Sequence, residues 1–127
     1  MNLKLAVFVM MGGAVGSLLR FCLQVAGNAP GSFLPWGTTT ANLLGSLAVG
    51  VLIPFVQFIP ESYRHLIMVG FLGGFTTMSS FASESVTLAT EAEWSRFVMY
   101  WLVSAVGCIA AAAIGMWLGL WLEKRLI

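Results

Sequence analysis

Four long apolar stretches, separated by short polar turns, constrain what this chain can fold into. No charged residue stands between Arg96 and Glu123, and residues 5–19 are also free of charge. A helix needs about 20 mainly apolar residues to cross a membrane. Only 9% of the 127 residues are charged, whereas a soluble domain carries about 25%. The sequence therefore predicts an all-α membrane protein, a single domain over residues 1–127 with spans near 3–26, 37–59, 66–90 and 95–122.

The charge pattern and the short motifs argue against several classes of function. The net charge is only +1 and the six Lys and Arg residues are scattered, so the chain offers no basic patch to nucleic acid. No nucleophile–base pair or metal-ligand cluster is visible, and the glycines at 70–74 follow no strand, as a nucleotide-binding fingerprint would require. We therefore expect neither an enzyme nor a nucleic-acid partner.

The distribution of positive charge specifies the orientation in the membrane only weakly. Four spans place both termini on one side. That side would carry four positive residues, namely Lys4, Arg64, Lys124 and Arg125. The other side would carry Arg96 and, at the end of the first span, Arg20. Because positive residues favour the cytoplasmic side and the bias is modest, the same chain could insert both ways.

Small residues recur at steps of four along the spans, a spacing that lets helix backbones approach closely. Gly12 and Gly16 share one face of the first span. The last span carries a longer ladder, formed by Gly107, Ala111, Gly115 and Gly119. These patterns predict tightly packed helix pairs. Pro54 is expected to kink the end of the second span.

The third span contains a stretch, GFLGGFTTMSSFASE at residues 70–84, that suits a continuous membrane helix poorly. Its fifteen residues include three glycines and five hydroxyl-bearing side chains. Glycine weakens a helix by about 1 kcal/mol relative to alanine, and loosened backbone at bilayer depth needs protein, ions or water to satisfy it. The stretch therefore predicts a broken helix with a functional role.

Hydrogen-bonding side chains also stand on the second and fourth spans. Asn42 lies deep in the second span, where a carboxamide is costly without partners, so we interpret it as functional. Tyr100, Ser104 and Cys108 form a row at steps of four on the last span. A single Ser or Thr more often bonds to its own or a neighbouring helix. Glu84 could mark a mouth, pair with a cation, or lie in an exposed exit turn.

Together these side chains could line a narrow polar path suited to an anion. Amide and hydroxyl donors bind an anion without the full charge of an arginine, which would hold the ion too strongly to release it. The edge of an aromatic ring is electropositive and can contact an anion in an otherwise dry pore. Phe81 is the candidate for such a contact, while packing is the commoner role of a membrane phenylalanine.

Three segments in order along the chain resemble the Fluc (CrcB-type) family of fluoride channels: GGAVGSLLR at 12–20, TTTANLLGS at 38–46 and GFLGGFTTMSSFASE at 70–84. The length fits four spans, and the third segment is highly specific. The resemblance implies an antiparallel, dual-topology homodimer in the inner cell membrane. Its two pores would export fluoride passively from the cytoplasm and so confer fluoride resistance.

The resemblance also implies roles for individual residues. Arg20 falls on a motif arginine near a vestibule. The backbone carbonyls of Gly73 and Thr76 fall where family members hold a structural sodium ion between subunits. The pore positions of the family correspond here to Asn42, Met78, Ser79, Ser80, Phe81, Tyr100 and Ser104.

Two positions depart from the family pattern. Met78 stands where the first phenylalanine of a pair is expected, and a thioether has no positive ring edge to offer an anion. Cys108 stands where a hydroxyl would be more useful, because a thiol is a weak donor. Throughput or selectivity could differ as a result.

Two other functions fit parts of the sequence. A small proton-coupled multidrug exporter is also a short four-span protein, and Glu84 would then be its coupling carboxylate. The chain could instead be a membrane scaffold without transport, or one subunit of an obligate heterodimeric channel. Drug resistance on expression would favour the exporter, and absence of flux from the purified chain would favour the others.

Overall fold

The computed structural model describes residues 2–127, which form helices joined by short turns, with no strand among them. Along the chain the elements are α1 (Leu3–Gly27), α2 (Trp36–Leu52), the 3₁₀ helix η1 (Ile53–Phe58), α3 (Glu61–Arg64), the π-helix η2 (His65–Leu72), α4 (Gly73–Phe75), α5 (Met78–Thr90), α6 (Trp94–Trp101), the π-helix η3 (Leu102–Val106) and α7 (Gly107–Leu126). They join into four helices long and apolar enough to cross a membrane: Leu3–Gly27, Trp36–Phe58, Glu61–Thr90 and Trp94–Leu126. The expected all-α fold with four apolar helices is confirmed.

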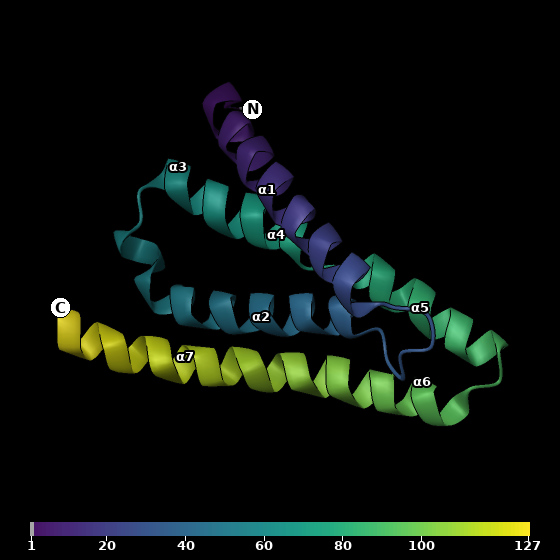
Figure 1. Ribbon diagram of the computed structural model, residues 1–127. Helices are drawn as coiled ribbons and strands as arrows, with labels where there is room; N and C mark the ends of the chain where they lie inside the picture. The colour runs from purple at the N-terminus through teal and green to yellow at the C-terminus, as the bar shows by residue number, and fades with distance from the viewer. Residues whose placement is uncertain (1) are drawn as a thin grey trace.

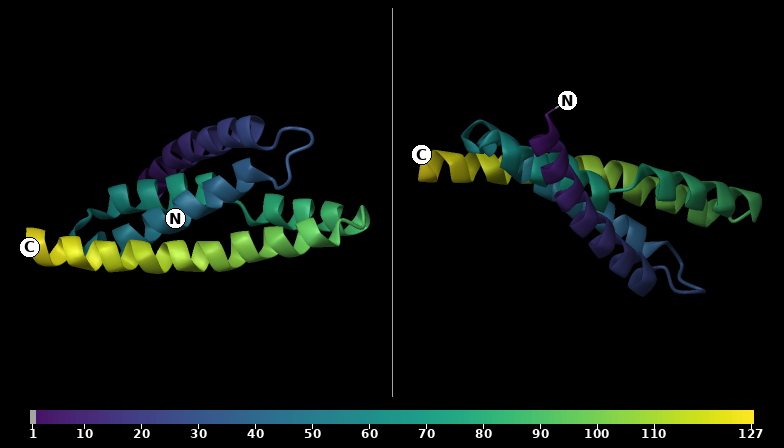
Figure 2. Two further views of the ribbon diagram at one scale, coloured as in Figure 1. Left: turned by 60° about the horizontal axis from the view of Figure 1, so that its bottom comes forward. Right: turned by 90° about the horizontal axis from the view of Figure 1, so that it is seen from above.

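The helices pack largely in pairs (Figure 1). α2 and α7 run side by side, and α1 crosses the first half of the third helix, formed by η2 and α4. Beyond its break the third helix continues as α5, which packs against α6. Seen from above, α1 lies at a steep angle to α7 (Figure 2). The two close pairs leave space for side chains between α2 and the third helix.

Glycines bring α1 against the third helix, as the small-residue spacing predicts. A Cβ on Gly12 would collide with the carbonyl oxygen of Leu66, and one on Gly16 would collide with that of Phe71. From the facing helix, a Cβ on Gly70 would lie 3.1 Å from the Cα of Gly12. The two backbones are therefore too close for any larger residue at these positions.

The glycine ladder of the last span packs against α2 in the same way. A Cβ on Gly115 would collide with the carbonyl oxygen of Leu47, and one on Gly119 would lie 2.6 Å from that of Val51. Gly50 of α2 is equally close to the backbone of α7. The prediction that this ladder buries a narrow face against another helix is confirmed.

The third helix breaks at Thr76 and Thr77, inside the stretch that composition singled out. Both residues are extended, with φ −82° and ψ 154° at Thr76 and φ −148° and ψ 112° at Thr77. Thr77 then caps α5, because its hydroxyl accepts the backbone N–H of Ser80 at 3.1 Å. The break therefore ends one helix and begins the next within two residues.

Prolines mark the change within the second helix and the start of the third. The second span changes from α-helix to 3₁₀ helix at Ile53, directly before Pro54, in agreement with the expected kink. The third helix begins at Glu61 rather than near residue 66. Pro60 before it is extended, with φ −54° and ψ 145°, and the negative charge of Glu61 suits the first turn of a helix.

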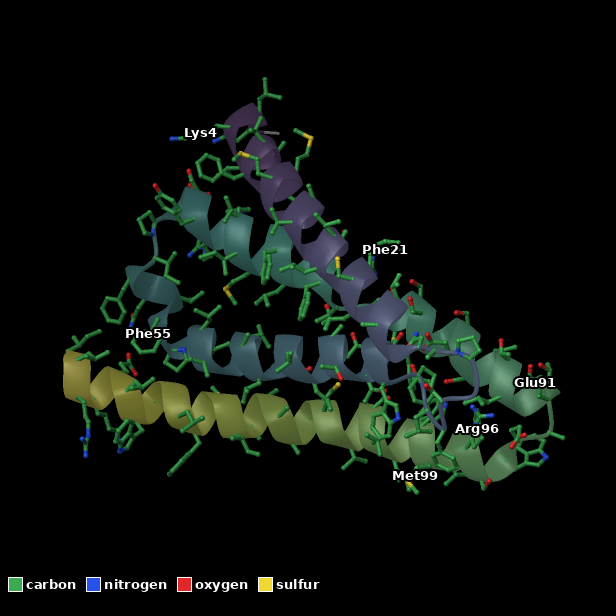
Figure 3. The ribbon with its side chains drawn as sticks, in the orientation of Figure 1. Lys4, Phe21, Phe55, Glu91, Arg96 and Met99 are labelled. Carbon is green, nitrogen blue, oxygen red and sulfur yellow. The ribbon has the colours of Figure 1, made fainter. Side chains whose placement is uncertain are left out.

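Large apolar side chains cover the outside of the molecule. Phe21 and Met99, for example, point away from the helices (Figure 3), and Ile109 and Trp117 are also exposed. Such a surface suits lipid or a second membrane chain rather than water. The buried apolar cluster is small and joins α5 to α6 and the loop before α2, through Leu34, Phe81, Leu88 and Tyr100.

Candidate functional site

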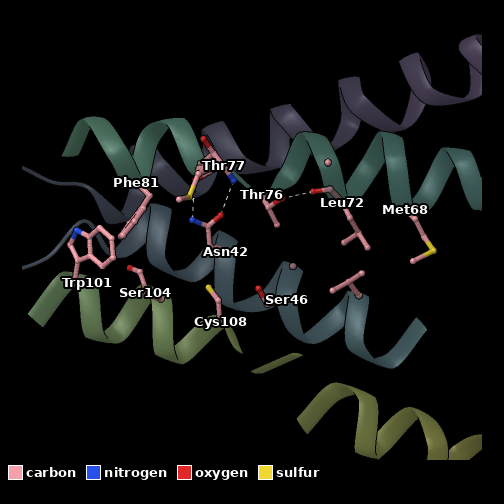
Figure 4. Close-up of a pocket in the computed structure, with 15 residues that line it drawn as sticks. Asn42, Ser46, Met68, Leu72, Thr76, Thr77, Phe81, Trp101, Ser104 and Cys108 are labelled. Atoms are coloured by element: carbon pink, nitrogen blue, oxygen red, sulfur yellow. Dashed lines mark hydrogen bonds between the residues drawn. The ribbon is translucent and has the colours of Figure 1, made fainter. Parts of the chain in front are cut away.

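A groove of about 480 Å³ lies between α2, the broken third helix and the fourth helix (Figure 4). Its walls are mostly apolar, with Met68 and Leu72 on one side. Seven of the lining side chains carry a hydrogen-bond donor, namely Asn42, Ser46, Thr76, Thr77, Trp101, Ser104 and Cys108. The groove therefore brings together polar residues from three different spans.

Asn42 holds the break in the third helix. Its Oδ1 accepts the backbone N–H of Thr77 at 2.7 Å, and its Nδ2 donates to the Thr77 carbonyl at 3.1 Å. In a continuous helix that N–H would return to the carbonyl of Gly73, four residues back. Asn42 thus replaces the helical partner of Thr77, and the second Nδ2 proton is left for the groove.

The wall formed by the fourth helix carries Ser104 and Cys108, one turn apart. Ser104 is only 4% exposed, and its hydroxyl oxygen finds no hydrogen-bond partner within residues 2–127. An unpaired buried polar group costs about 1–3 kcal/mol, which a ligand bound by the hydroxyl would offset. Tyr100, one turn earlier, does not line the groove and donates to Glu84 Oε2 at 2.6 Å.

Phe81 lies between the groove and an aromatic cluster. It is 6% exposed, and its ring centroid is 5.2 Å from those of both Tyr100 and Trp101. Met78 stands at the start of α5, lines the same groove and is 74% exposed. The groove therefore has an aromatic wall at Phe81 and a flexible thioether beside it.

A second set of polar residues lies where α1, α2, α5 and α6 meet. We call it the polar cluster, and it comprises Gln24, Asn28, Thr38, Ser80, Glu84 and Tyr100. Thr77 links it to the groove, because its Oγ1 lies 3.1 Å from Ser80 Oγ and 3.2 Å from the hydroxyl of exposed Ser79. Hydrogen bonds therefore run from Asn42 through the helix break to Tyr100.

Glu84 accepts hydrogen bonds from three elements of the fold. Its Oε1 lies 2.9 Å from Asn28 Nδ2 and 2.7 Å from Thr38 Oγ1, while Oε2 accepts the Tyr100 hydroxyl. The sequence left three settings open for this residue. The structure places the half-buried carboxylate inside the polar cluster, six residues before the end of α5, rather than in an exit turn.

A smaller cavity of about 280 Å³ lies beside the polar cluster, between the α1–α2 loop and the end of α5. Glu91 and Arg96 both lie on this side of the molecule (Figure 3). Arg96 holds the loop through its guanidinium, which donates to the carbonyls of Phe33 at 2.7 Å and Ser32 at 2.8 Å. Its charge thus serves to tether the loop.

The remaining predicted residues lie at the edges of this arrangement. Arg20 is half-buried on α1 and is not among the residues that line either cavity. Gly73 and Thr76 line the groove, and Gly73 is exposed. Because the Thr77 N–H is taken by Asn42, the Gly73 carbonyl lacks its usual helical donor. Unwound carbonyls of this kind fit a sodium ion.

Sequence reasoning did not identify four residues of this region, namely Gln24, Asn28, Thr38 and Trp101. Gln24 follows Arg20 by four positions, and a polar residue so near the end of a span was the available signal. Thr38 stood in the TTT run that opens the second span. Trp101 had no such signal, because tryptophan is common at membrane interfaces.

A family model described as "CrcB-like protein, Camphor Resistance (CrcB)" matches residues 7–116, which is most of the chain. The chain belongs to this family. The resemblance indicated by its three motifs is thus confirmed. Together with the four apolar helices, membership indicates a CrcB-family protein that crosses the membrane several times.

Individual relatives in the CrcB family carry a functional name. A protein of Leptospira interrogans named fluoride-specific ion channel FluC is 41% identical over 120 residues, covering 91% of this chain and 94% of the relative. A protein of Magnetococcus marinus with the same name is 40% identical over 116 residues, covering 88% and 94%. One of Rhodospirillum rubrum is 40% identical over 120 residues, covering 89% of each.

Proposed function

We propose that this CrcB-family chain is a fluoride channel that exports fluoride passively from the cytoplasm across the inner cell membrane. The observation that carries the proposal is one groove lined by uncharged donors from two helices, Asn42 on α2 and the unpaired Ser104 hydroxyl on the fourth helix. Such donors bind a small anion and still release it. The names of the relatives support fluoride as that anion.

The proposed path follows the groove and the helix break. Asn42 and Ser104 would contact the ion directly. Ser79 and Ser80 would add hydroxyl donors at the start of α5. Phe81 would offer a ring edge, and Met78 would take the neighbouring position through its thioether. Tyr100 would hold the polar cluster beside the path, and Arg20 would attract anions to a vestibule.

The functional unit in this proposal is an antiparallel homodimer with two pores. Support comes from the groove, whose Met78 and Trp101 are 74% and 45% exposed although they belong to its wall. A second copy would cover such a surface. Insertion in both orientations agrees with the modest charge bias, and apolar lipid-facing surface is present on the other helices.

A structural sodium ion between the two copies completes the proposal. The carbonyls of Gly73 and Thr76 would be its ligands from each chain, because the break frees them from helical hydrogen bonds. A hard cation suits carbonyl oxygens, and a site shared by two chains would couple ion binding to assembly. Replacing sodium by a bulky organic cation is expected to weaken the dimer and slow fluoride flux.

Fluoride efflux from proteoliposomes tests the channel. Efflux should require valinomycin to carry compensating potassium, because a channel moves charge, and it should not change when a pH gradient is imposed. Efflux without valinomycin that follows the pH gradient would contradict a passive channel. Single cysteines at the termini, labelled from one side, should react in about half of the molecules if both orientations are present.

The alternatives give different results in the same system. A proton-coupled drug exporter would acidify or alkalinise the vesicle on adding a cationic drug, with Glu84 as the required carboxylate. Glu84 is held by three hydrogen bonds, which a coupling carboxylate would have to break in each cycle. A heterodimer subunit would give no flux alone and would form no crosslinks between differently tagged copies of itself.

A further inference from the structure

We propose that Gln24 is a positioning residue that fixes the direction of the hydrogen bonds around Ser80 and leaves the Ser80 hydroxyl proton free for the permeating anion. This role rests on the proposed channel function, because Ser80 lies beside the helix break where the anion would pass. Neither Gln24, on α1, nor Ser80, on α5, is among the residues that line the groove, and Thr77 joins Ser80 to it.

The carboxamide of Gln24 donates in two directions. Its Nε2 lies 3.1 Å from Thr38 Oγ1 and 3.1 Å from Ser80 Oγ. A carboxamide nitrogen carries two protons, so each hydroxyl oxygen receives one of them. Gln24 therefore links the start of α2 to the start of α5 and is the donor in both bonds.

The direction of these bonds is imposed by Glu84. An ionised carboxylate only accepts, and Thr38 Oγ1 lies 2.7 Å from Glu84 Oε1, so the single Thr38 hydroxyl proton points to Glu84. The Thr38 oxygen is then left to accept, from Gln24 and from Asn28 Nδ2 at 3.2 Å. Gln24 must present its nitrogen, not its carbonyl oxygen, to this side.

Ser80 is consequently an acceptor on both of its lone pairs. Gln24 fills one, and the Thr77 hydroxyl donates to the other at 3.1 Å. Because that proton of Thr77 is used, the 3.2 Å contact between Thr77 Oγ1 and Ser79 Oγ has Ser79 as donor. Within residues 2–127, no acceptor is found for the Ser80 hydroxyl proton.

Such a hydroxyl is a good donor for an anion. Hydrogen bonds accepted by an oxygen polarise its own O–H, and they strengthen the hydrogen bond that this O–H donates by about 10–30% per bond. Ser80 is the third residue of α5, and Thr76, four residues back, is extended and outside the helix, so Ser80 lacks the helical carbonyl to which a serine often turns its proton. With Gln24 and Thr77 on its lone pairs, Ser80 keeps the proton for the path instead.

Gln24→Glu tests the direction of the bonds. At about pH 8 the ionised carboxylate would accept from Ser80 and withdraw its proton, so fluoride flux should fall roughly tenfold relative to wild type. A protonated carboxyl can donate again, so the ratio should rise as the pH falls to about 4, below the ordinary glutamate pKa of about 4.3. Three charged or titratable groups surround this position. Glu84 is connected to it by the hydrogen bond from Thr38, Tyr100 is bonded to Glu84, and Arg20 lies one turn earlier on α1.

Gln57→Glu is the matched control, because Gln57 is exposed on η1 and outside the polar cluster. Its flux ratio to wild type should be the same at both pH values. If Gln24→Glu also has a pH-independent ratio, Gln24 does not direct the Ser80 proton and the inference is overturned. The valinomycin-dependent rate is the quantity to compare, because it excludes leakage of neutral hydrogen fluoride.

A double-mutant cycle gives a second, independent readout. Gln24→Met removes the donor while keeping the length of the side chain, and Ser80→Ala removes the hydroxyl. If Gln24 acts through Ser80, the double variant should lose no more flux than Ser80→Ala alone. Additive losses would mean that Gln24 only holds α1 in place. Absence of electrogenic flux in wild type would instead contradict the proposed function itself, so the two failures are distinguishable.

Discussion

Asn42 and Thr77, which both line the groove, exchange two hydrogen bonds: the Thr77 N–H donates to Asn42 Oδ1 at 2.7 Å, and Asn42 Nδ2 donates to the Thr77 carbonyl at 3.1 Å. A side chain thereby takes the place of the backbone partner that a continuous helix would supply. A carboxamide within a membrane span and a broken helix would each be costly alone. Here the Asn42 carboxamide and the freed backbone groups of Thr77 satisfy each other's hydrogen bonds, which lowers both costs. Asn42 thus both fixes the break and offers its remaining proton to the path.

Asn42→Asp is expected to lower fluoride flux by more than about tenfold. Both carboxylate oxygens can only accept, so the bond to the Thr77 carbonyl is lost and the free donor in the groove becomes a negative charge that repels the anion. Fluoride-electrode efflux from proteoliposomes measures the loss. Asn2→Asp is the matched control, since Asn2 caps α1 at the exposed end of the chain and should leave flux unchanged. Unchanged flux in Asn42→Asp would remove Asn42 from the pore lining.

Cys108→Ser is expected to raise fluoride flux by about two- to fivefold, because a hydroxyl donates to an anion more strongly than a thiol. The substitution would extend the row begun by Ser104, one turn earlier on the same wall of the groove. Initial efflux rates at equal protein density test it. Cys22→Ser should have no effect, because Cys22 is exposed on α1 and does not line the groove. Equal rates for the Cys108 variant and wild type would show that the ion does not contact this position.

Gly16→Ala is expected to destabilise the protein by about 1–3 kcal/mol, because its Cβ would collide with the carbonyl oxygen of Phe71 and force α1 away from the third helix. Gly13→Ala lies on the same helix and places its nearest contact at 3.8 Å, an ordinary van der Waals distance, so it should be tolerated. Thermal unfolding in detergent compares the two variants. Equal midpoints would contradict the close approach of the two backbones.

Much of the fold follows from local features of the sequence. The length of the apolar stretches predicts the four helices, and the spacing of Gly115 and Gly119 predicts a packed helix pair. Both features depend on residues that are close together in the chain. The glycines and hydroxyls of residues 70–84 likewise indicate the break. Its position at Thr76 and Thr77 was not predictable from composition, because Asn42, 35 residues away, supplies the hydrogen bonds that hold it.

The polar cluster was the least predictable part of the candidate site. Gln24 reaches Ser80 across 56 residues of sequence, and Asn28 reaches Glu84 across another 56. Nothing in the local pattern around either residue specifies such a partner. The three settings left open for Glu84 reflect the same limit, because whether a carboxylate at a span end meets water or three donors is decided by tertiary packing.

Ala92→Gly is expected to stabilise the protein by about 1 kcal/mol. Ala92 has φ 58° in the turn after α5, where the Glu93 N–H returns to the Leu88 carbonyl at 2.9 Å and the Ala92 N–H to that of Ala89 at 3.2 Å. This helix end favours glycine, since a Cβ costs energy in the left-handed region. The midpoint of thermal unfolding should rise, and Ala89→Gly, within the last turn of α5, should lower it by a similar amount. A lower midpoint for Ala92→Gly would mean that the alanine side chain makes a stabilising contact that outweighs its backbone strain.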